Sequence, residues 1–190
     1  MEGTPVPAYP DAQLEITAIQ RKIAEEFYER NILVFHGSAV AVDGEVYLFT
    51  AKSGTGKSTH TRLWREVLGD KAIMLNDDKP FLEMKENAVI AHGSPWMGKH
   101  RLGCNMSLPL KAICILERGE RNSIEPISAK EALSMLFQQS QSPANPAHLP
   151  KYLELLDLLA RNTAFYRLRC NMDPEAAEIA YKAMSGKDHI

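Results

Sequence analysis

Apolar residues recur along this chain at two spacings, one typical of helices and the other of strands. Between residues 11 and 30 they fall mostly every three or four positions, with charged residues on the opposite face, which predicts an amphipathic helix. Ser128 and Glu131 form a capping box that opens another helix, and Asp173 followed by Pro174 predicts the start of the last one. Helices are therefore predicted at residues 11–30, 57–68, 129–139, 152–161 and 174–185.

Shorter apolar runs, bounded by glycine, asparagine and aspartate, predict strands. Asp43-Gly44 separates two such runs, and this dipeptide is a strong hairpin signal. The strand that leads into residue 51 is therefore predicted to be the second arm of an antiparallel pair. The predicted strands are residues 32–35, 39–42, 45–50, 72–75, 81–84, 89–91, 111–117 and 164–170.

Strands that alternate with helices but include hairpins predict a mixed β-sheet with flanking helices, which is an α/β fold. The length of 190 residues fits a single domain over residues 1–190. Within it we expect residues 1–10 to be an irregular lead-in and residues 186–190 a polar tail. Residues 142–150 contain three prolines and are predicted to be a linker or lid.

The residues from 51 to 59 fit the phosphate-binding loop pattern G-x-x-x-x-G-K-[ST], except that Ala51 replaces the first glycine. A predicted strand precedes this loop and a predicted helix follows it, so its backbone N–H groups can surround a phosphate chain at the helix N-terminus. Lys57 can reach the β- and γ-phosphates, and the Ser58 hydroxyl can bind Mg²⁺. The alternative is a surface turn. The predicted nucleotide-binding residues are Ala51, Lys52, Ser53, Gly54, Thr55, Gly56, Lys57, Ser58 and Thr59.

Asp77 and Asp78 follow an apolar strand, beyond the helix of the phosphate loop. Two neighbouring carboxylates beside a dication can divide the chemistry of phosphoryl transfer, since one holds the metal and the other accepts a hydroxyl proton. We assign the metal to Asp77 and the base to Asp78, and the order can be reversed because side chains at a strand end point either way. An Asx-type turn before Pro80 is the structural alternative.

Two further groups are candidates for the same site. His36 follows a strand and precedes a glycine, so it can lie at the sheet edge and assist proton transfer, or it can be a structural histidine. Residues 93–103 form a predicted loop in which Lys99 and Arg101 stand near Trp96. These cations can bind phosphate or an anionic acceptor, or they can belong to a solvated turn.

The net charge of −2 offers no electrostatic case for binding nucleic acid or a membrane surface. The three cysteines are scattered and lack C-x-x-C spacing, which argues against disulfides or a zinc site and for a reducing compartment. The beginning of the chain has no basic and apolar signal pattern, and no apolar run is long enough to span a bilayer. We therefore expect a cytoplasmic protein, and the sequence does not indicate an oligomeric state.

The motifs between residues 36 and 78 occur in an order that resembles HPr kinase/phosphorylase: a histidine-glycine pair, the phosphate loop and an Asp-Asp pair. The loop and the aspartates are also similar to the nucleotide site of ATP-dependent phosphoenolpyruvate carboxykinase, which shares that fold. The resemblance implies a phosphoenolpyruvate carboxykinase-like fold and ATP-dependent phosphorylation of a serine hydroxyl. It also implies that an aspartate of the pair is the base, with His36 close to it.

These observations lead to the hypothesis of an ATP- and Mg²⁺-dependent kinase. Its acceptor would be a hydroxyl, such as that of a serine, on a peptide, a protein or a small molecule. The alternatives are a regulatory module that binds a nucleotide without transferring phosphate, and a carboxykinase-like or other nucleotide-dependent enzyme. The predicted catalytic residues are Asp78, Asp77, His36 and Lys57, the predicted metal ligands are Ser58 and Asp77, and the predicted substrate or phosphate contacts are Lys99 and Arg101.

Overall fold

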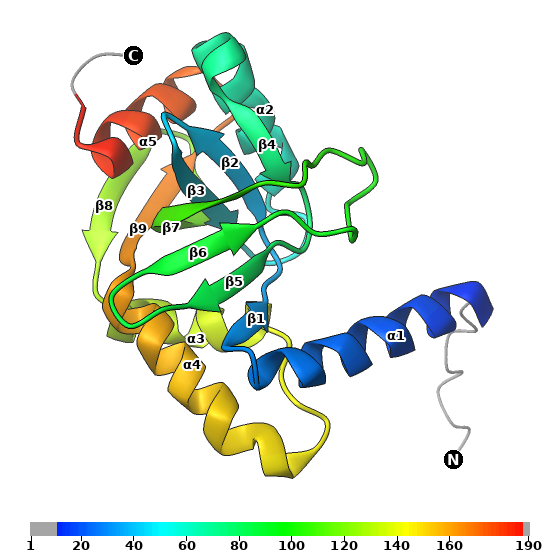
Figure 1. Ribbon diagram of the computed structural model, residues 1–190. Helices are drawn as coiled ribbons and strands as arrows, with labels where there is room; N and C mark the ends of the chain where they lie inside the picture. Colours follow the sequence, from blue (N-terminus) through cyan, green and yellow to red (C-terminus); the bar gives the residue numbers. More distant parts are fainter. Residues whose placement is uncertain (1–10, 188–190) are drawn as a thin grey trace, which may run out of the picture.

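The computed structural model describes residues 11–187, which form a mixed α/β fold (Figure 1). Its helices are α1 (Asp11–Tyr28), α2 (Lys57–Leu68), α3 (Ala129–Gln139), α4 (Leu149–Asn162) and α5 (Glu175–Ser185), with short 3-10 helices at Gly69–Lys71 and Pro146–His148. Its strands are β1 (Ile32–Val34), β2 (Ser38–Val42), β3 (Glu45–Thr50), β4 (Ile73–Asn76), β5 (Phe81–Met84), β6 (Val89–His92), β7 (Ser107–Arg118), β8 (Ser123–Ile127) and β9 (Ala164–Cys170).

The strands form one mixed sheet in the order β1-β5-β6-β7-β3-β2-β4, and β9 pairs with β7 and with β8. β7 is parallel to β3 and to β9, whereas the other pairs are antiparallel. The predicted mixed sheet with flanking helices is therefore confirmed.

The hairpin before the phosphate loop is also confirmed, since β2 pairs with β3 in antiparallel register and Val42 lies opposite Glu45. Its turn residues Asp43 and Gly44 both have positive φ, at 52° and 81°. A two-residue turn with this geometry matches the twist of the strands, and aspartate-glycine is a sequence that tolerates it. A local signal thus determines how the chain approaches the phosphate loop.

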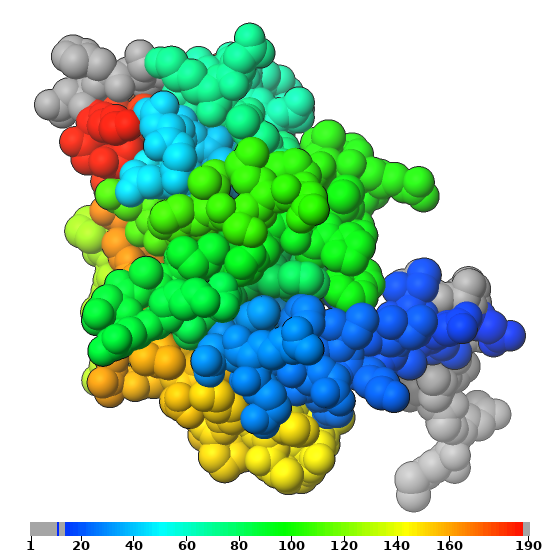
Figure 2. Space-filling model, in the orientation of Figure 1, coloured from blue at the N-terminus to red at the C-terminus, as the bar shows by residue number. Residues whose placement is uncertain are grey.

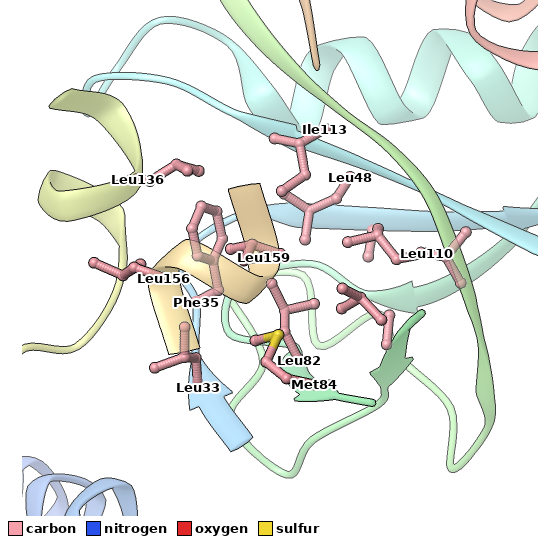
Figure 3. Packing of buried hydrophobic residues seen from close by; sticks show 14 of the residues in the cluster. Leu33, Phe35, Leu48, Leu82, Met84, Leu110, Ile113, Leu136, Leu156 and Leu159 are labelled. Carbon is pink, nitrogen blue, oxygen red and sulfur yellow. The ribbon is translucent and has the colours of Figure 1, made fainter. Parts of the chain in front are cut away.

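Buried side chains lie on both faces of the central strands. Along β3, Leu48 faces a core that includes residues of α3 and α4, whereas Tyr47 and Phe49 face a second core formed with α2 and α5. Figure 3 shows part of the first core, in which Leu136 of α3 and Leu159 of α4 approach the sheet. Strands covered on both faces are apolar at successive positions, which explains the continuous apolar runs in the sequence.

Pairing brings several strand ends to one edge of the sheet. The parallel register places the ends of β3, β7 and β9 together. β4 is antiparallel to β2, so its last residue, Asn76, lies opposite Ala39 near the start of β2. Because β2 is itself antiparallel to β3, the start of β2 also lies beside the end of β3. In open α/β sheets ligands bind outside the carboxyl ends of strands, and this edge carries the phosphate loop and the aspartate pair.

The structure corrects several predicted boundaries. β7 begins at Ser107, four residues before its prediction, and β1 ends at Val34 with Phe35 outside it. Residues 142–150 are not simply a linker, because they contain a 3-10 helix and the first residues of α4. The N-cap of α5 is Pro174, and the Asp173 side chain instead accepts a hydrogen bond from Asn171. The predicted lead-in at residues 1–10 and the last three residues of the predicted tail lie outside the described residues.

α1 differs from its prediction in another respect. It projects from the rest of the molecule, as Figures 1 and 2 show, and ends at Tyr28. Leu14, Ile16 and Ile19 were expected on its buried face, but each is about half exposed because that part of the helix extends past the sheet. Only its last turns pack on the first core, through residues such as Tyr28.

Among residues 11–187 no helix is both long and apolar enough to cross a membrane.

Candidate functional site

The glycine loop between β3 and α2 has the backbone that its sequence predicts. Gly54 and Gly56 have φ values of 77° and 121°, which are unfavourable for residues with a Cβ atom. Gly56 is the N-cap of α2, so the helix begins at Lys57 with its positive end at the loop. Ala51 is fully buried and does not have positive φ, so an alanine is compatible with the backbone where the pattern usually has glycine.

The Lys57 side chain turns back along the loop, and its Nζ donates to the Ala51 carbonyl oxygen at 3.4 Å. Burial lowers the pKa of this ammonium group, and nearby Lys79 lowers it further, while Asp78 raises it. Among residues 11–187 its one hydrogen bond is this long contact to a carbonyl, and a half-buried ammonium group of that kind is well suited to bind an anion.

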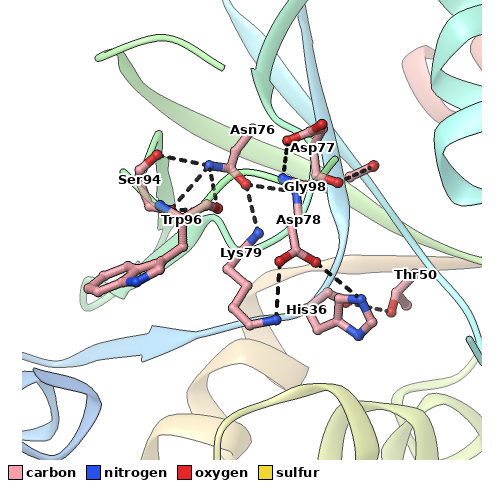
Figure 4. A network of polar contacts seen from close by, with 10 residues as sticks. His36, Thr50, Asn76, Asp77, Asp78, Lys79, Ser94, Trp96 and Gly98 are labelled. Carbon is pink, nitrogen blue, oxygen red and sulfur yellow. Dashed lines mark hydrogen bonds and ion pairs between the residues drawn. The ribbon is translucent and has the colours of Figure 1, made fainter. Parts of the chain in front are cut away.

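The backbone of the aspartate pair is fixed to the start of β2. The Ser38 hydroxyl donates to the Asp77 carbonyl oxygen at 3.0 Å, and the Gly37 N–H donates to the Asp78 carbonyl oxygen at 2.9 Å. From the other side, Asn76 Oδ1 accepts from the backbone N–H of Asp78 at 2.9 Å. Both aspartates therefore have a defined position where the strand ends (Figure 4).

The two carboxylates have different surroundings. Asp77 is only 6% exposed, and its Oδ1 accepts the backbone N–H of Gly98 at 2.7 Å. Asp78 is more accessible and lies between two basic groups, with Oδ1 at 3.4 Å from His36 Nε2 and Oδ2 at 3.2 Å from Lys79 Nζ. Figure 4 shows Asp78 directed toward His36 and Asp77 directed toward the 93–103 segment.

His36 is held by its backbone, since its N–H donates to Gln139 at 2.7 Å and its carbonyl oxygen accepts from the Thr50 hydroxyl at 3.0 Å. Burial lowers the pKa of its imidazole, and the charges of Lys57 and Lys79 lower it further, against the opposing effect of Asp78. His36 is therefore neutral at neutral pH, and one ring nitrogen then carries a proton that it can donate to a carboxylate.

These groups surround one cavity of about 460 Å³. Lys99 lines it, whereas Arg101 does not. Arg101 is exposed and has a φ of 50°, in a turn where its N–H donates to the Gly98 carbonyl oxygen. The cavity is lined by His36, Gly54, Gly56, Lys57, Ser58, Thr59, Arg62, Asp77, Asp78, Gly98, Lys99 and His100.

The donor set around this cavity fits Mg²⁺. Asp77 and Ser58 line it together, and the described contacts of the Asp77 carboxylate leave its Oδ2 atom without a hydrogen bond. Among residues 11–187 no group of three or more His, Cys, Asp or Glu side chains could hold a metal. Mg²⁺ needs no such group when a nucleotide is present, because it is usually bound by one or two carboxylates, phosphate oxygens and water.

Several residues at this edge were not singled out from the sequence. Arg118, at the end of β7, donates from Nη2 to the Gly54 carbonyl oxygen at 2.6 Å across 64 sequence positions. Lys79 pairs with Asp78, and the backbone of Gly98 contacts Asp77. A signal for Arg118 was present, because β7 follows a pattern typical of a parallel strand and such strands end at the phosphate-loop edge. Nothing in the sequence indicates the backbone contact of Gly98.

Comparisons with known proteins give three findings. A family model described as SynChlorMet cassette protein ScmC matches residues 10–174. No curated protein matches the chain. Solved structures that match include the Hpr(Ser) kinase/phosphatase from Coxiella burnetii, with 10% identity and a TM-score of 0.45 over 80% of this chain and 95% of that chain.

Proposed function

The chain belongs to the family of SynChlorMet cassette protein ScmC, and for this member we propose an ATP-dependent kinase. It transfers the γ-phosphoryl group to a hydroxyl, such as that of a serine, on a peptide, a protein or a small molecule. The observation that carries the proposal is the convergence of Lys57, Asp77, Asp78 and His36 on one cavity beside the glycine loop. A module that only bound nucleotide would need the loop and the lysine but no second, accessible carboxylate paired with a neutral histidine.

The site residues divide into a binding set and a reacting set. The loop N–H groups and Lys57 bind the phosphates at the positive end of α2. Asp77 and Ser58 would hold Mg²⁺, which neutralises charge on the phosphate oxygens. Asp77 suits this role because it lines the cavity and the Gly98 N–H fixes one of its carboxylate oxygens, while no described residue donates a hydrogen bond to the other oxygen.

Asp78 is the proposed base. The acceptor hydroxyl gives its proton to the Asp78 carboxylate while its oxygen forms a bond to the γ-phosphorus. The bond between that phosphorus and the oxygen bridging to the β-phosphorus breaks, and ADP leaves with the electron pair. His36 Nε2 lies 3.4 Å from Asp78 Oδ1 and orients the carboxylate. Because His36 is neutral, it does not form a permanent ion pair with this carboxylate.

The test compares Asp77→Asn and Asp78→Asn, with Asp70→Asn as the matched control because Asp70 is exposed beyond the far end of α2. Each variant is titrated with ATP, with and without Mg²⁺, and incubated with γ-labelled ATP and a mixture of serine-containing peptides and small hydroxyl compounds. Asp78→Asn should slow transfer by about 10²–10⁴-fold with ATP affinity nearly unchanged. Asp77→Asn should weaken binding only when Mg²⁺ is present, since an asparagine oxygen can still accept the Gly98 N–H.

Wild-type transfer rates in both variants would refute the proposed catalytic roles. If the wild-type protein bound Mg²⁺–ATP but released no labelled phosphate to any acceptor or to water, a regulatory nucleotide-binding module would replace the kinase. The cytoplasmic location stays a prediction, and so does the absence of nucleic-acid and membrane partners.

A further inference from the structure

A second cavity of about 460 Å³ lies on the other side of the glycine loop from the aspartate pair. It opens between the loop, the end of β7 and the residues after β9, so it occupies the same edge of the sheet. Gly54, Gly56 and Thr59 line both cavities, which makes the loop the boundary between them. A ligand whose phosphates lie at Lys57 can therefore extend into the second cavity without leaving the loop.

The lining of this cavity is unlike that of the first. Its walls are mainly apolar, with Leu63 from α2, Leu116 from β7 and Met172 after β9. Met172 is 76% exposed and belongs to neither buried core, so its flexible side chain can adapt to a ligand. Its volume is within the range of small-molecule sites, about 300–1,000 Å³, and such sites combine apolar walls with a few placed polar groups.

The polar side chains in this lining are Thr55, Thr59, His60, Arg118 and Asn171, of which Arg118 and His60 carry the argument. Arg118 donates one guanidinium N–H to the Gly54 carbonyl oxygen, which fixes its plane beside the loop. A planar guanidinium group stacks well on an aromatic ring.

His60 supplies the second group at the floor of the cavity, where it is 2% exposed. Its Nε2 accepts the Trp64 indole N–H at 3.1 Å, so the ring proton belongs on Nδ1. Within residues 11–187 this Nδ1 has no hydrogen-bond partner. A buried donor without an acceptor is costly, so this polar edge of His60 is a group whose hydrogen bonding the surrounding protein leaves unmet next to the cavity.

We propose that this cavity binds the nucleoside part of the nucleoside triphosphate, with the base between Arg118 and the apolar wall that includes Met172. The inference rests on the proposed nucleotide binding and adds to it residues from the ends of β7 and β9 that the phosphate-loop pattern does not contain. It explains why an apolar cavity adjoins a phosphate loop. It also assigns the affinity for the nucleoside to residues far from the loop in the sequence, such as Arg118 and Met172.

The first experiment separates the nucleoside from the phosphates. Mg²⁺–ATP and inorganic tripolyphosphate are titrated by calorimetry into wild type, Met172→Ala and Arg118→Met. The control is Arg121→Met, an exposed arginine in the β7–β8 turn that does not line the cavity. In wild type ATP should bind at least about tenfold more tightly than tripolyphosphate. Met172→Ala should reduce this preference by about five- to tenfold while tripolyphosphate affinity stays the same.

The second experiment uses a native thiol as a reporter. Cys170 lines the cavity, Cys104 lies elsewhere at comparable partial exposure, and Cys114 is fully buried. Burial raises the pKa of the Cys170 and Cys104 thiols, so alkylation is run at mildly alkaline pH. ATP should slow the alkylation of Cys170 several-fold but not that of Cys104, and tripolyphosphate should protect neither.

The outcomes distinguish this inference from the proposed function. Equal affinity for ATP and tripolyphosphate, or an unchanged preference in Met172→Ala together with unprotected Cys170, would overturn the nucleoside site while leaving phosphate binding at the loop intact. Failure of both ligands to bind would overturn the proposed function and the nucleoside site together. Normal ATP preference and Cys170 protection in a protein that transfers no phosphate would support the cavity and refute the kinase.

Discussion

His60 makes the stability of this fold sensitive to acid. It lies in α2 one turn after Lys57, with its ring centroid 4.6 Å from that of Phe49 and its Nε2 bound to Trp64. Burial lowers its pKa from the ordinary value of 6.5 to about 3. The folded protein therefore keeps this imidazole neutral at pH values at which the unfolded chain protonates it.

The sign and size of the effect follow from that difference. Above pH 6.5 both states are neutral at this position, and His60 adds no pH dependence. As the pH falls from 6.5 toward 3, only the unfolded chain takes up the proton, so the folded state loses stability. Each pH unit in this window is worth up to about 1.4 kcal/mol, so at pH 4.5 the loss amounts to about 3 kcal/mol.

The perturbation is His60→Gln, because the glutamine oxygen can still accept the Trp64 indole N–H but cannot titrate. Urea unfolding at pH 7 and pH 4.5 gives the free energy of unfolding for wild type, His60→Gln and the control His100→Gln, which replaces an exposed histidine. Whatever the stability of His60→Gln at pH 7, its loss between the two pH values should be smaller than that of wild type by about 3 kcal/mol. His36 and the carboxylates titrate in all three proteins, so their contributions cancel in the comparison.

If wild type and His60→Gln lost the same free energy between pH 7 and pH 4.5, His60 would not be held neutral by burial. An equally reduced loss in His100→Gln would show that the effect does not come from the buried ring. Either result would refute the reasoning.

The remaining predictions concern the ligands. Lys57→Ala should weaken Mg²⁺–ATP binding by about 2–3 kcal/mol, because it removes a charge-assisted contact to phosphate. The measurement is calorimetry with Lys71→Ala as the control, since Lys71 is an exposed lysine beyond the far end of α2. Equal affinities of wild type and Lys57→Ala would contradict the prediction. The double variant Lys99→Ala/Arg101→Ala should raise the KM for an anionic acceptor or for ATP. Lys99→Ala alone should account for most of the change, because Lys99 lines the cavity and Arg101 does not. Steady-state kinetics of the single and double variants measure this, and unchanged constants would identify the cluster as a solvated turn.

Features that depend on neighbouring residues could be predicted from the sequence. Examples are the Asp43-Gly44 turn, the glycine loop and the capping box at Ser128. In each of them the backbone conformation depends on residue types that lie within a few positions of one another. The aspartate pair was also correctly located at a strand end, since β4 ends at Asn76. Such local signals are sufficient to predict that the histidine, the lysine and the two aspartates lie in one region, and in the fold all four line one cavity.

Features that depend on contacts between distant main-chain groups could not be predicted in this way. The Gly98 N–H and the Gly54 carbonyl oxygen bind side chains that are 21 and 64 positions away, and every residue type except proline offers both groups. β8 was missed because it is an edge strand that contains Pro126 and pairs only with β9, so it lacks an apolar run. Leu14, Ile16 and Ile19 of α1 are half exposed for a related reason. The spacing of apolar residues predicts an apolar face of the helix but does not indicate which part of the protein packs against it.

The 93–103 segment is held to Asp77 by the backbone N–H of Gly98, whereas other residues of the segment have side chains that line the cavity. A Cβ atom at position 98 would lie 3.2 Å from Asp77 Oδ2, so a side chain at this position would crowd the carboxylate. The neighbouring Lys99 and His100 side chains take no part in the anchor and line the cavity instead. Substitutions beside Gly98 can therefore change which side chains face the cavity over evolutionary time, while the Gly98–Asp77 contact stays in place.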